Sequence, residues 1–350
     1  TLEAHSATQA GAWAAARADQ IRRRAKSLAD SLNRQCFGNE TGGMAECLSA
    51  VTWESGVADN PAADNTSIVT IKGFSDSPAA GVPETTKHLK VGQQIAWGAT
   101  STTTAALGRG KVSQVLSTTT FQITVGDDTL ASATPVPGNI FFLSDETVLG
   151  TSLGQRSANN EITGLGSIIS DTGSLQGINP ATETSWKSQI FTNPAGAGTT
   201  RAIEEDLMQQ VVDAVEEETA GEVDMIVCHH SARRSYANML KDKNGEQFAP
   251  TKVKGGYDRS FLTFHAGGRD IPLVDDKDAP HRQMDFISKE DLKVYEVKPF
   301  AWDESSGGVW KWSADQDAVT GFGKVYFNLG TSNRKALASL RDIEVTGIRR

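Results

Sequence analysis

The chain has 350 residues, of which 38% are hydrophobic and 22% charged, and its formal net charge is -9. This length allows two or three domains around a large core, and the composition is typical of a globular protein. The acidic balance argues against a dedicated nucleic-acid reader, although it suits a protein that lies near DNA without adhering to it. No apolar run approaches the roughly 20 residues of a membrane helix, so we expect no membrane partner.

The cysteines are Cys36, Cys47 and Cys228. An odd and sparse set of this kind does not describe a disulfide scaffold, and it suits a reducing compartment. No signal peptide is visible, and the sequence begins at Thr1 instead of Met, so we expect that the natural N-terminus has been cut off, left out or processed away.

Residues 9–37 are predicted to form one long helix, because apolar residues recur along it at helical spacing. At about 1.5 Å per residue the helix would be roughly 40 Å long, and the glycines after Phe37 would end it. Its other faces are basic, which allows contact with phosphates, although a solvated face is the more common role of such residues. The basic residues are Arg17, Arg22, Arg23, Arg24, Lys26 and Arg34.

Between residues 49 and 146, Thr, Ser, Gly and Val dominate and helical periodicity disappears. Short strands are predicted there, and their spacing favours a small barrel or sandwich with an aromatic core. The predicted strands are 68–71, 94–97, 111–116, 121–125 and 140–143, and the aromatic residues are Trp97, Phe121, Phe141 and Phe142. Because this segment separates two parts of similar character, we interpret it as an insertion.

Residues 147–200 are rich in Gly, Ser, Thr and Asn. A long irregular segment usually wraps around another element or another subunit, and here Trp186 and Phe191 are expected to anchor it.

Residues 201–240 predict a helix, a buried strand and a second helix. Ile203, Leu207, Val211, Ala214 and Val215 mark the core face of the first helix, whose opposite face is acidic. The run 225–228 predicts the strand, and Ser231 is expected to cap the helix 232–240. The strand-to-helix turn lacks glycines, which excludes a Rossmann or P-loop site there.

The remaining chain predicts further strands. We expect strands at 261–264 and 271–274, a strand pair formed by 284–287 and 293–297, and aromatic strands around Gly307-Gly308. The last strands are expected at 325–327 and 343–345.

No stretch forms a specific catalytic or metal-binding signature. Cys228, His229 and His230 are neighbours on a strand end and point in different directions. Asp275, Asp276 and Asp278 surround Lys277 and lack EF-hand spacing, which favours a solvated loop. The stretch 150–154 reads Gly-x-Ser-x-Gly, but no strand-to-helix turn is predicted there, and composition alone leaves a Ser-His-Asp triad open. We predict that the protein is not an enzyme and has no metal or cofactor.

Four stretches resemble the major capsid proteins of tailed bacteriophages, which have the Hong Kong-type phage capsid fold. They are the helix ending at 37–42, where Asn39-Glu40 replaces the usual Asp-Gly, the unit 225–240, the stretch 268–277 and the stretch 329–334. The resemblance covers about 250 residues outside the insertion.

The resemblance implies an α+β phage capsid fold with a long spine helix, peripheral and axial domains and an inserted all-β domain. The implied segments are the spine helix (1–48), the insertion (49–146), a peripheral segment (147–200), the axial domain (201–297) and the strands returning to the peripheral domain (298–350). The family's N-terminal arm and extended loop are absent from this chain, so cross-linking chemistry cannot be transferred to it.

The implied function is a shell subunit that assembles into pentamers and hexamers around double-stranded DNA, held without sequence specificity. The resemblance places the protein in the virion after assembly in the host cytoplasm, with scaffold or protease, portal and decoration proteins as partners. Expected subunit-interface residues are Trp186, Phe191, Arg201, Arg233, Arg234 and Lys254, and expected DNA-facing residues are Arg17, Arg22, Arg23, Arg24 and Lys26.

Three alternatives remain open from the sequence. One is an encapsulin-like compartment, which shares the fold and encloses enzymes instead of DNA. Another is a hydrolase without a visible motif. The third is that the β insertion binds a host glycan or a decoration protein.

Overall fold

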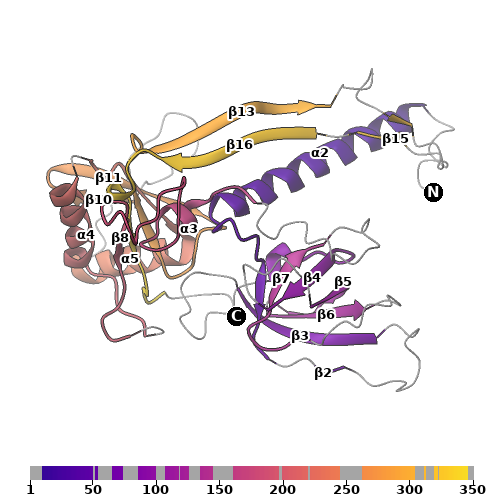
Figure 1. The fold of residues 1–350 in the computed structure, drawn as a ribbon, viewed down its shortest axis with the longest axis horizontal. Helices are drawn as coiled ribbons and strands as arrows, with labels where there is room; N and C mark the ends of the chain where they lie inside the picture. The colour runs from indigo at the N-terminus through magenta and orange to yellow at the C-terminus, as the bar shows by residue number, and fades with distance from the viewer. Residues whose placement is uncertain are drawn as a thin grey trace.

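The computed structural model of the chain describes residues 10–49, 52–53, 65–73, 86–99, 107–117, 119–125, 135–144, 161–196, 199–219, 221–244, 262–303, 311–312, 319–321 and 323–345. It has three parts (Figure 1). A sheet body with helices lies at one end, and a long helix and a two-stranded ribbon project from it. In this view the helix runs between the ribbon, above, and a small barrel, below. No helix in the described part of the chain is long and apolar enough to cross a membrane.

The long helix is α2 (Ala10–Cys36), as the sequence predicted. Its last turn closes with backbone hydrogen bonds from the amides of Phe37 and Gly38, and Gly42 has a positive φ of 76° in the turn that follows. The helix is exposed around Arg22, Arg23 and Arg24 and is continuously half-buried only in its last turns, from Asp30 onward. It is therefore anchored at its C-terminal end.

The barrel consists of antiparallel strands in the order β1-β7-β4-β5-β6-β3, with β2 added on β3. Because β1 pairs with both β7 and β3, the sheet closes on itself, so the predicted barrel or sandwich is a barrel. The strands are β1 (Ala45–Cys47), β2 (Thr52–Trp53), β3 (Asn65–Gly73), β4 (Gln94–Gly98), β5 (Gly108–Val115), β6 (Thr120–Val125) and β7 (Ile140–Leu143), and a 3₁₀ turn η1 (Thr86–His88) precedes β4.

Aromatic side chains fill the barrel. Trp97 and Phe121 each meet Phe141 edge to face, with ring centroids 6.2 and 5.6 Å apart. Gly108 leaves room for the indole, because a Cβ there would lie 2.4 Å from the Trp97 ring. Phe142 is buried as well, but it packs with Ile140 outside the main barrel cluster, since neighbouring residues of a strand face opposite sides.

The body is a six-stranded sheet in the order β10-β11-β9-β12-β17-β8, in which β9 pairs in parallel with β11 and antiparallel with β12. Its strands are β8 (Gln189–Phe191), β9 (Met225–His229), β10 (Thr263–Ala266), β11 (Arg269–Asp276), β12 (Met284–Ile287) and β17 (Ala338–Leu340). Its helices are α3 (Leu165–Ile168), α4 (Glu205–Glu218) and α5 (His230–Asn244), and a 3₁₀ turn η2 (Arg334–Ala336) precedes β17.

Both faces of this sheet are covered. Ile226 and Cys228 of β9 belong to the cluster that includes α4 and α5, whereas Val227 belongs to the cluster around α3. The buried strand between two helices predicted for 201–240 is thus observed. Met208 and Val212 are buried together with Val211 and Val215, so the apolar face of α4 is broader than the predicted one.

Several sequence predictions are wrong. β12 does not pair with the strand at 293–297, because β12 lies inside the body between β9 and β17. The last strand of the described residues is β17, and at 343–345 only an isolated bridge from Arg201 to Ile343 forms. α5 begins at His230, so Ser231 lies in its first turn instead of capping it, with its hydroxyl 2.8 Å from His229 Nδ1.

β13 (Leu292–Trp302) pairs with β16 (Gly323–Thr331) to form the projecting ribbon, and β14 (Lys311–Trp312) pairs with β15 (Val319–Thr320). The turn predicted at Gly307-Gly308 lies outside the described residues. At the base of the ribbon, Leu292 and Leu329 pack with Phe37 against the α3 cluster. The end of α2 and the base of the ribbon therefore pack into the same apolar cluster.

Candidate functional site

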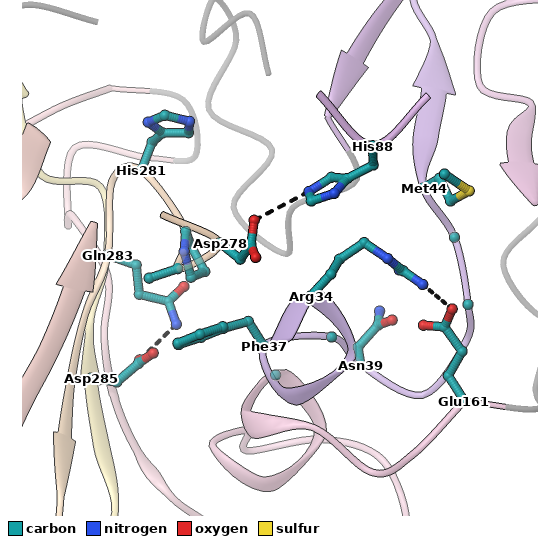
Figure 2. A pocket seen from close by; sticks show the side chains of 16 residues that line it. Arg34, Phe37, Asn39, Met44, His88, Glu161, Asp278, His281, Gln283 and Asp285 are labelled. Carbon is teal, nitrogen blue, oxygen red and sulfur yellow. Dashed lines mark hydrogen bonds and ion pairs between the residues drawn. The ribbon is translucent and has the colours of Figure 1, made fainter. Parts of the chain in front are cut away.

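A pocket lies where the end of α2, the loop after β11 and the turn η1 of the barrel meet (Figure 2). Its space is about 800 Å³, including the part open to solvent. Its lining residues are Arg34, Phe37, Gly38, Asn39, Gly42, Gly43, Met44, His88, Glu161, Gly166, Asp278, Ala279, Pro280, His281, Gln283 and Asp285. The pocket thus collects side chains from all three parts of the molecule.

The loop after β11 holds α2. The Asn33 side-chain amide donates to Asp276 Oδ1 at 2.9 Å and to Asp278 Oδ2 at 2.8 Å. The ammonium of Lys277 reaches Asp30 Oδ1 at 2.5 Å. The aspartates of this loop, predicted to be solvated, are therefore half-buried to almost fully buried acceptors that fix the helix to the body.

The same loop reaches the turn η1 of the barrel. His88 Nε2 lies 3.6 Å from Asp278 Oδ1, and the Asp278 side chain is only 2% exposed. Figure 2 shows this pair across the pocket from Arg34 and Glu161, which form a second ion pair. A carboxylate this deeply buried needs partners, and both acidic groups have them.

The segment after the barrel closes the pocket. Thr163 donates to Glu40 Oε2 at 3.1 Å, and Gly166 donates to the carbonyl of Gly38 at 3.1 Å. A side chain at Gly164 would not fit, since a Cβ there would lie 2.3 Å from that same carbonyl oxygen. The helix end and this segment are thus packed backbone to backbone.

The side chains around the pocket hold α2, the barrel and the body together. The Gln283 amide donates to Asp285 at 2.7 Å, and the ring centroid of the buried His281 lies 3.8 Å from that of His229. Across the described residues, no group of three or more His, Cys, Asp and Glu could hold a metal ion. Burial raises the pKa of the nearby Cys228 thiol to about 12, which disfavours its nucleophilic thiolate at neutral pH.

Three predicted interface residues lie together at the β8 edge of the body. Trp186 is half-buried against the α3 cluster, and its indole nitrogen has no hydrogen-bond partner within the described part. Phe191 packs against the α4 cluster. Arg201 donates to the Phe191 carbonyl at 2.8 Å, and burial lowers the pKa of its guanidinium. All three hold the edge in place, and their role between subunits stays a prediction.

The other predicted residues lie apart from this edge. Arg233 and Arg234 are exposed on α5, and Arg233 pairs with Asp275 at 3.4 Å. Lys254 lies outside the described residues. On α2, Arg22, Arg23, Arg24 and Lys26 are exposed, Arg23 pairs with Asp19 at 2.8 Å, and the Arg17 side chain is outside the described part. Arg22 and Lys26, four residues apart, share one face of α2, whereas Arg23 and Arg24 point to other sides of the helix.

Sequence reasoning missed Arg334, a buried cation at the centre of the body. Its guanidinium donates to the carbonyls of Ile168, Gly173, Ser167 and Thr172 at 2.8–3.1 Å. Burial lowers the pKa of Arg334. The only local signal is Asn333, which caps η2 by accepting from the Lys335 amide; nothing in the sequence marks the carbonyls 161 to 167 residues away.

Residues 142–307 match the family model of the SU10 major capsid protein. This match confirms the resemblance to phage major capsid proteins, and it includes two of the four stretches that carried it, 225–240 and 268–277. The matched segment holds most of the body and all of β13, and the family has a structural role in the capsid shell of the virion. No curated protein matches the chain.

Similar solved structures include a phage capsid, an encapsulin and a procapsid. The cyanophage A-1(L) capsid is 19% identical, with 53% of this chain and 61% of that chain covered and a TM-score of 0.39. The encapsulin complex of Synechococcus elongatus is 14% identical, with 46% and 55% covered and a TM-score of 0.33. The satellite phage P4 procapsid is 13% identical, with 52% and 60% covered and a TM-score of 0.27. The chain therefore spans about three fifths of their length.

Proposed function

We propose that the chain is the shell subunit of an icosahedral capsid, assembling as pentamers and hexamers that enclose double-stranded DNA. The family match over residues 142–307 carries this proposal. The shape supports it, because a projecting helix and ribbon anchored at one end give a subunit several surfaces for neighbours. Such interfaces bury on the order of 1,600 Å² each, and closure of a ring multiplies their effect.

In this proposal each part of the molecule has its own role in the shell. In this proposal α2 is the spine helix, the body between 201 and 297 is the axial domain that meets its copies around five- and six-fold axes, and the barrel is an insertion. The β8 edge with Trp186 and Phe191 forms peripheral contacts. The pocket of Figure 2 joins the three parts, so that movement at one interface is transmitted to the others.

The exposed arginines of α2 face the packaged DNA in this proposal. A helix that exposes Arg22, Arg23, Arg24 and Lys26 contacts phosphates without reading bases, which fits retention without sequence specificity. Scaffold or protease, portal and decoration proteins are the further partners that a shell of this kind requires.

Nuclease protection of purified native particles tests the proposal. Intact particles should retain double-stranded DNA that resists added nuclease and is released on disruption. Particles that contain protein cargo and no nucleic acid would overturn the DNA-enclosing function and favour an encapsulin-like compartment, which is the second candidate because an encapsulin is among the similar structures.

A further inference from the structure

The pocket of Figure 2 contains a buried hydrogen-bond acceptor that the chain leaves unused. Gln283 lines the pocket and is only 4% exposed. Its amide nitrogen donates to Asp285 Oδ1 at 2.7 Å, which fixes the orientation of the amide, and its Oε1 has no hydrogen-bond partner within the described part of the chain. Because a buried oxygen without a donor is costly, this position favours a donor that comes from outside the chain.

The lining of the pocket is acidic. Arg34 and Glu161 balance each other in an ion pair. The Asp278 side chain and the whole of Asp285 are each 2% exposed, and they leave the lining with two negative charges when its histidines are neutral. Figure 2 shows the Gln283 side chain on the same side of the pocket as these two aspartates. Buried carboxylates beside an unused amide oxygen favour a positively charged donor.

A primary ammonium group meets both requirements. It carries one positive charge and three N–H donors, so a single group can satisfy an amide oxygen and a carboxylate together. A metal ion fits less well, because no group of three or more His, Cys, Asp and Glu among the described residues could hold one. The space of about 800 Å³, part of which is open to solvent, admits several carbon atoms behind the ammonium.

We propose that this pocket binds a primary ammonium group, which donates to Gln283 Oε1 and to Asp278 while Asp285 adds negative charge. The group comes from a small amine in solution or from a lysine side chain of another chain, and its chemistry is the same in both cases. Asp278 also accepts from Asn33 of α2 and pairs with His88 of the barrel. A bound ammonium therefore stabilises the contacts that hold the three parts of the molecule together, and it does so within one subunit, whether or not a shell forms.

Hydrogen–deuterium exchange of the unassembled wild-type protein tests the site. n-Butylammonium has the charge and the donors of a lysine side chain, and it should slow exchange in residues 30–38 and 277–284 several-fold, with saturation. Tetramethylammonium has the charge without N–H donors, and 1-butanol has the alkyl chain without the charge, so both should leave exchange unchanged at the same ionic strength. Equal slowing by the two cations, or no slowing by n-butylammonium, would overturn the proposal.

A pair of charge-matched variants supplies a second readout. Asp278→Asn removes a carboxylate from the pocket with little change in shape and should weaken n-butylammonium binding about tenfold. Asp270→Asn is the control, because it removes the same charge from a position of β11 whose side chain is 73% exposed, and it should leave binding unchanged. Equal affinities of the two variants would contradict the assignment. The wild-type comparison remains decisive if Asp278→Asn weakens the fold.

Mass spectrometry of the native protein separates the two sources. Release of about one small amine per chain on denaturation identifies a free ligand. No released amine, together with a response to n-butylammonium that is lost on assembly, identifies a lysine side chain of another chain. Shells that form normally from a protein on which n-butylammonium has no effect would overturn the site and leave the proposed function standing.

Discussion

The sheet body and the projection formed by α2 and the ribbon differ in how far the chain covers its own surface. In the body, even a buried cation such as Arg334 finds carbonyl partners within the chain. In the projection, Val297 and the residues Arg22 to Arg24 of α2 stay exposed, and the cluster that ties helix and ribbon to the body lies at the shared base around Phe37. The body is therefore expected to fold on its own contacts, whereas the projection is completed by other molecules.

Removing Arg334 should have the largest effect on stability, because buried carbonyl groups of the body then lose their hydrogen-bond donor. Arg334→Ala leaves four buried carbonyls without their donor, and we expect a loss of about 5 kcal/mol in the free energy of unfolding. Urea denaturation measures it. Arg24→Ala, an exposed arginine of α2, is the control and should change stability by less than about 0.5 kcal/mol. Equal effects of the two variants would contradict the contrast between body and projection.

The barrel is a third region whose dependence on its own buried contacts can be compared with that of the body and the projection. Trp97→Ala removes a fully buried indole from its centre and should cost the barrel about 3–5 kcal/mol. Amide hydrogen exchange should rise in β4, β5 and β7 and stay unchanged in β9. Val136→Ala, at an exposed site of the same module, should leave exchange as it is. A matching rise in β9 would show that barrel and body unfold as one unit.

Substitutions in the projection should reduce DNA retention without reducing the stability of the subunit. Arg22→Ala combined with Arg23→Ala removes two exposed positive charges and should lower DNA retention several-fold while empty shells still form. Quantifying nuclease-protected DNA per particle measures the effect. Arg22→Lys combined with Arg23→Lys keeps the charges and should retain DNA. Unchanged retention in the alanine variant would remove α2 from the DNA-facing surface.

The smallest effect concerns the anchor of α2. The hydrogen bond from Lys277 lowers the pKa of Asp30 below its ordinary 3.8. A lowered folded-state pKa means that this contribution is present above the unfolded-state pKa and is lost as pH falls through the folded value, so the window lies below about pH 4. Lys277→Met should raise the Asp30 pKa toward 3.8, measured by NMR titration, with Lys289→Met as control. An unchanged Asp30 titration would refute the contact.

The elements predicted correctly are those whose buried residues follow a regular pattern within the element itself. The apolar run of β9, the periodicity of α4 and the alternating strands of the barrel each carry their own signal. β17 carries almost none, because it has three residues, Ala338–Leu340, and becomes a strand through pairing with β12 and β8. The false hairpin at 284–297 arose because neighbouring strands usually pair, whereas here β12 is drawn into the body.

The contacts that fix α2 to the loop after β11 were the least predictable from the sequence. Asn33 meets Asp276 and Asp278 across more than 240 residues of sequence, and no local pattern records a contact of that range. Those aspartates resembled a solvated loop because polarity alone does not distinguish solvent from a distant amide. Val297 was likewise assigned to an ordinary strand, since a bulge depends on the register against β16, which only the fold reveals.

Negative-stain electron microscopy of the full-length purified protein tests the central claim most directly. We predict closed polyhedral shells of uniform size, or pentameric and hexameric rings. A monodisperse monomer or dimer under every assembly condition tried would contradict the shell function and return attention to an enzyme or binding module.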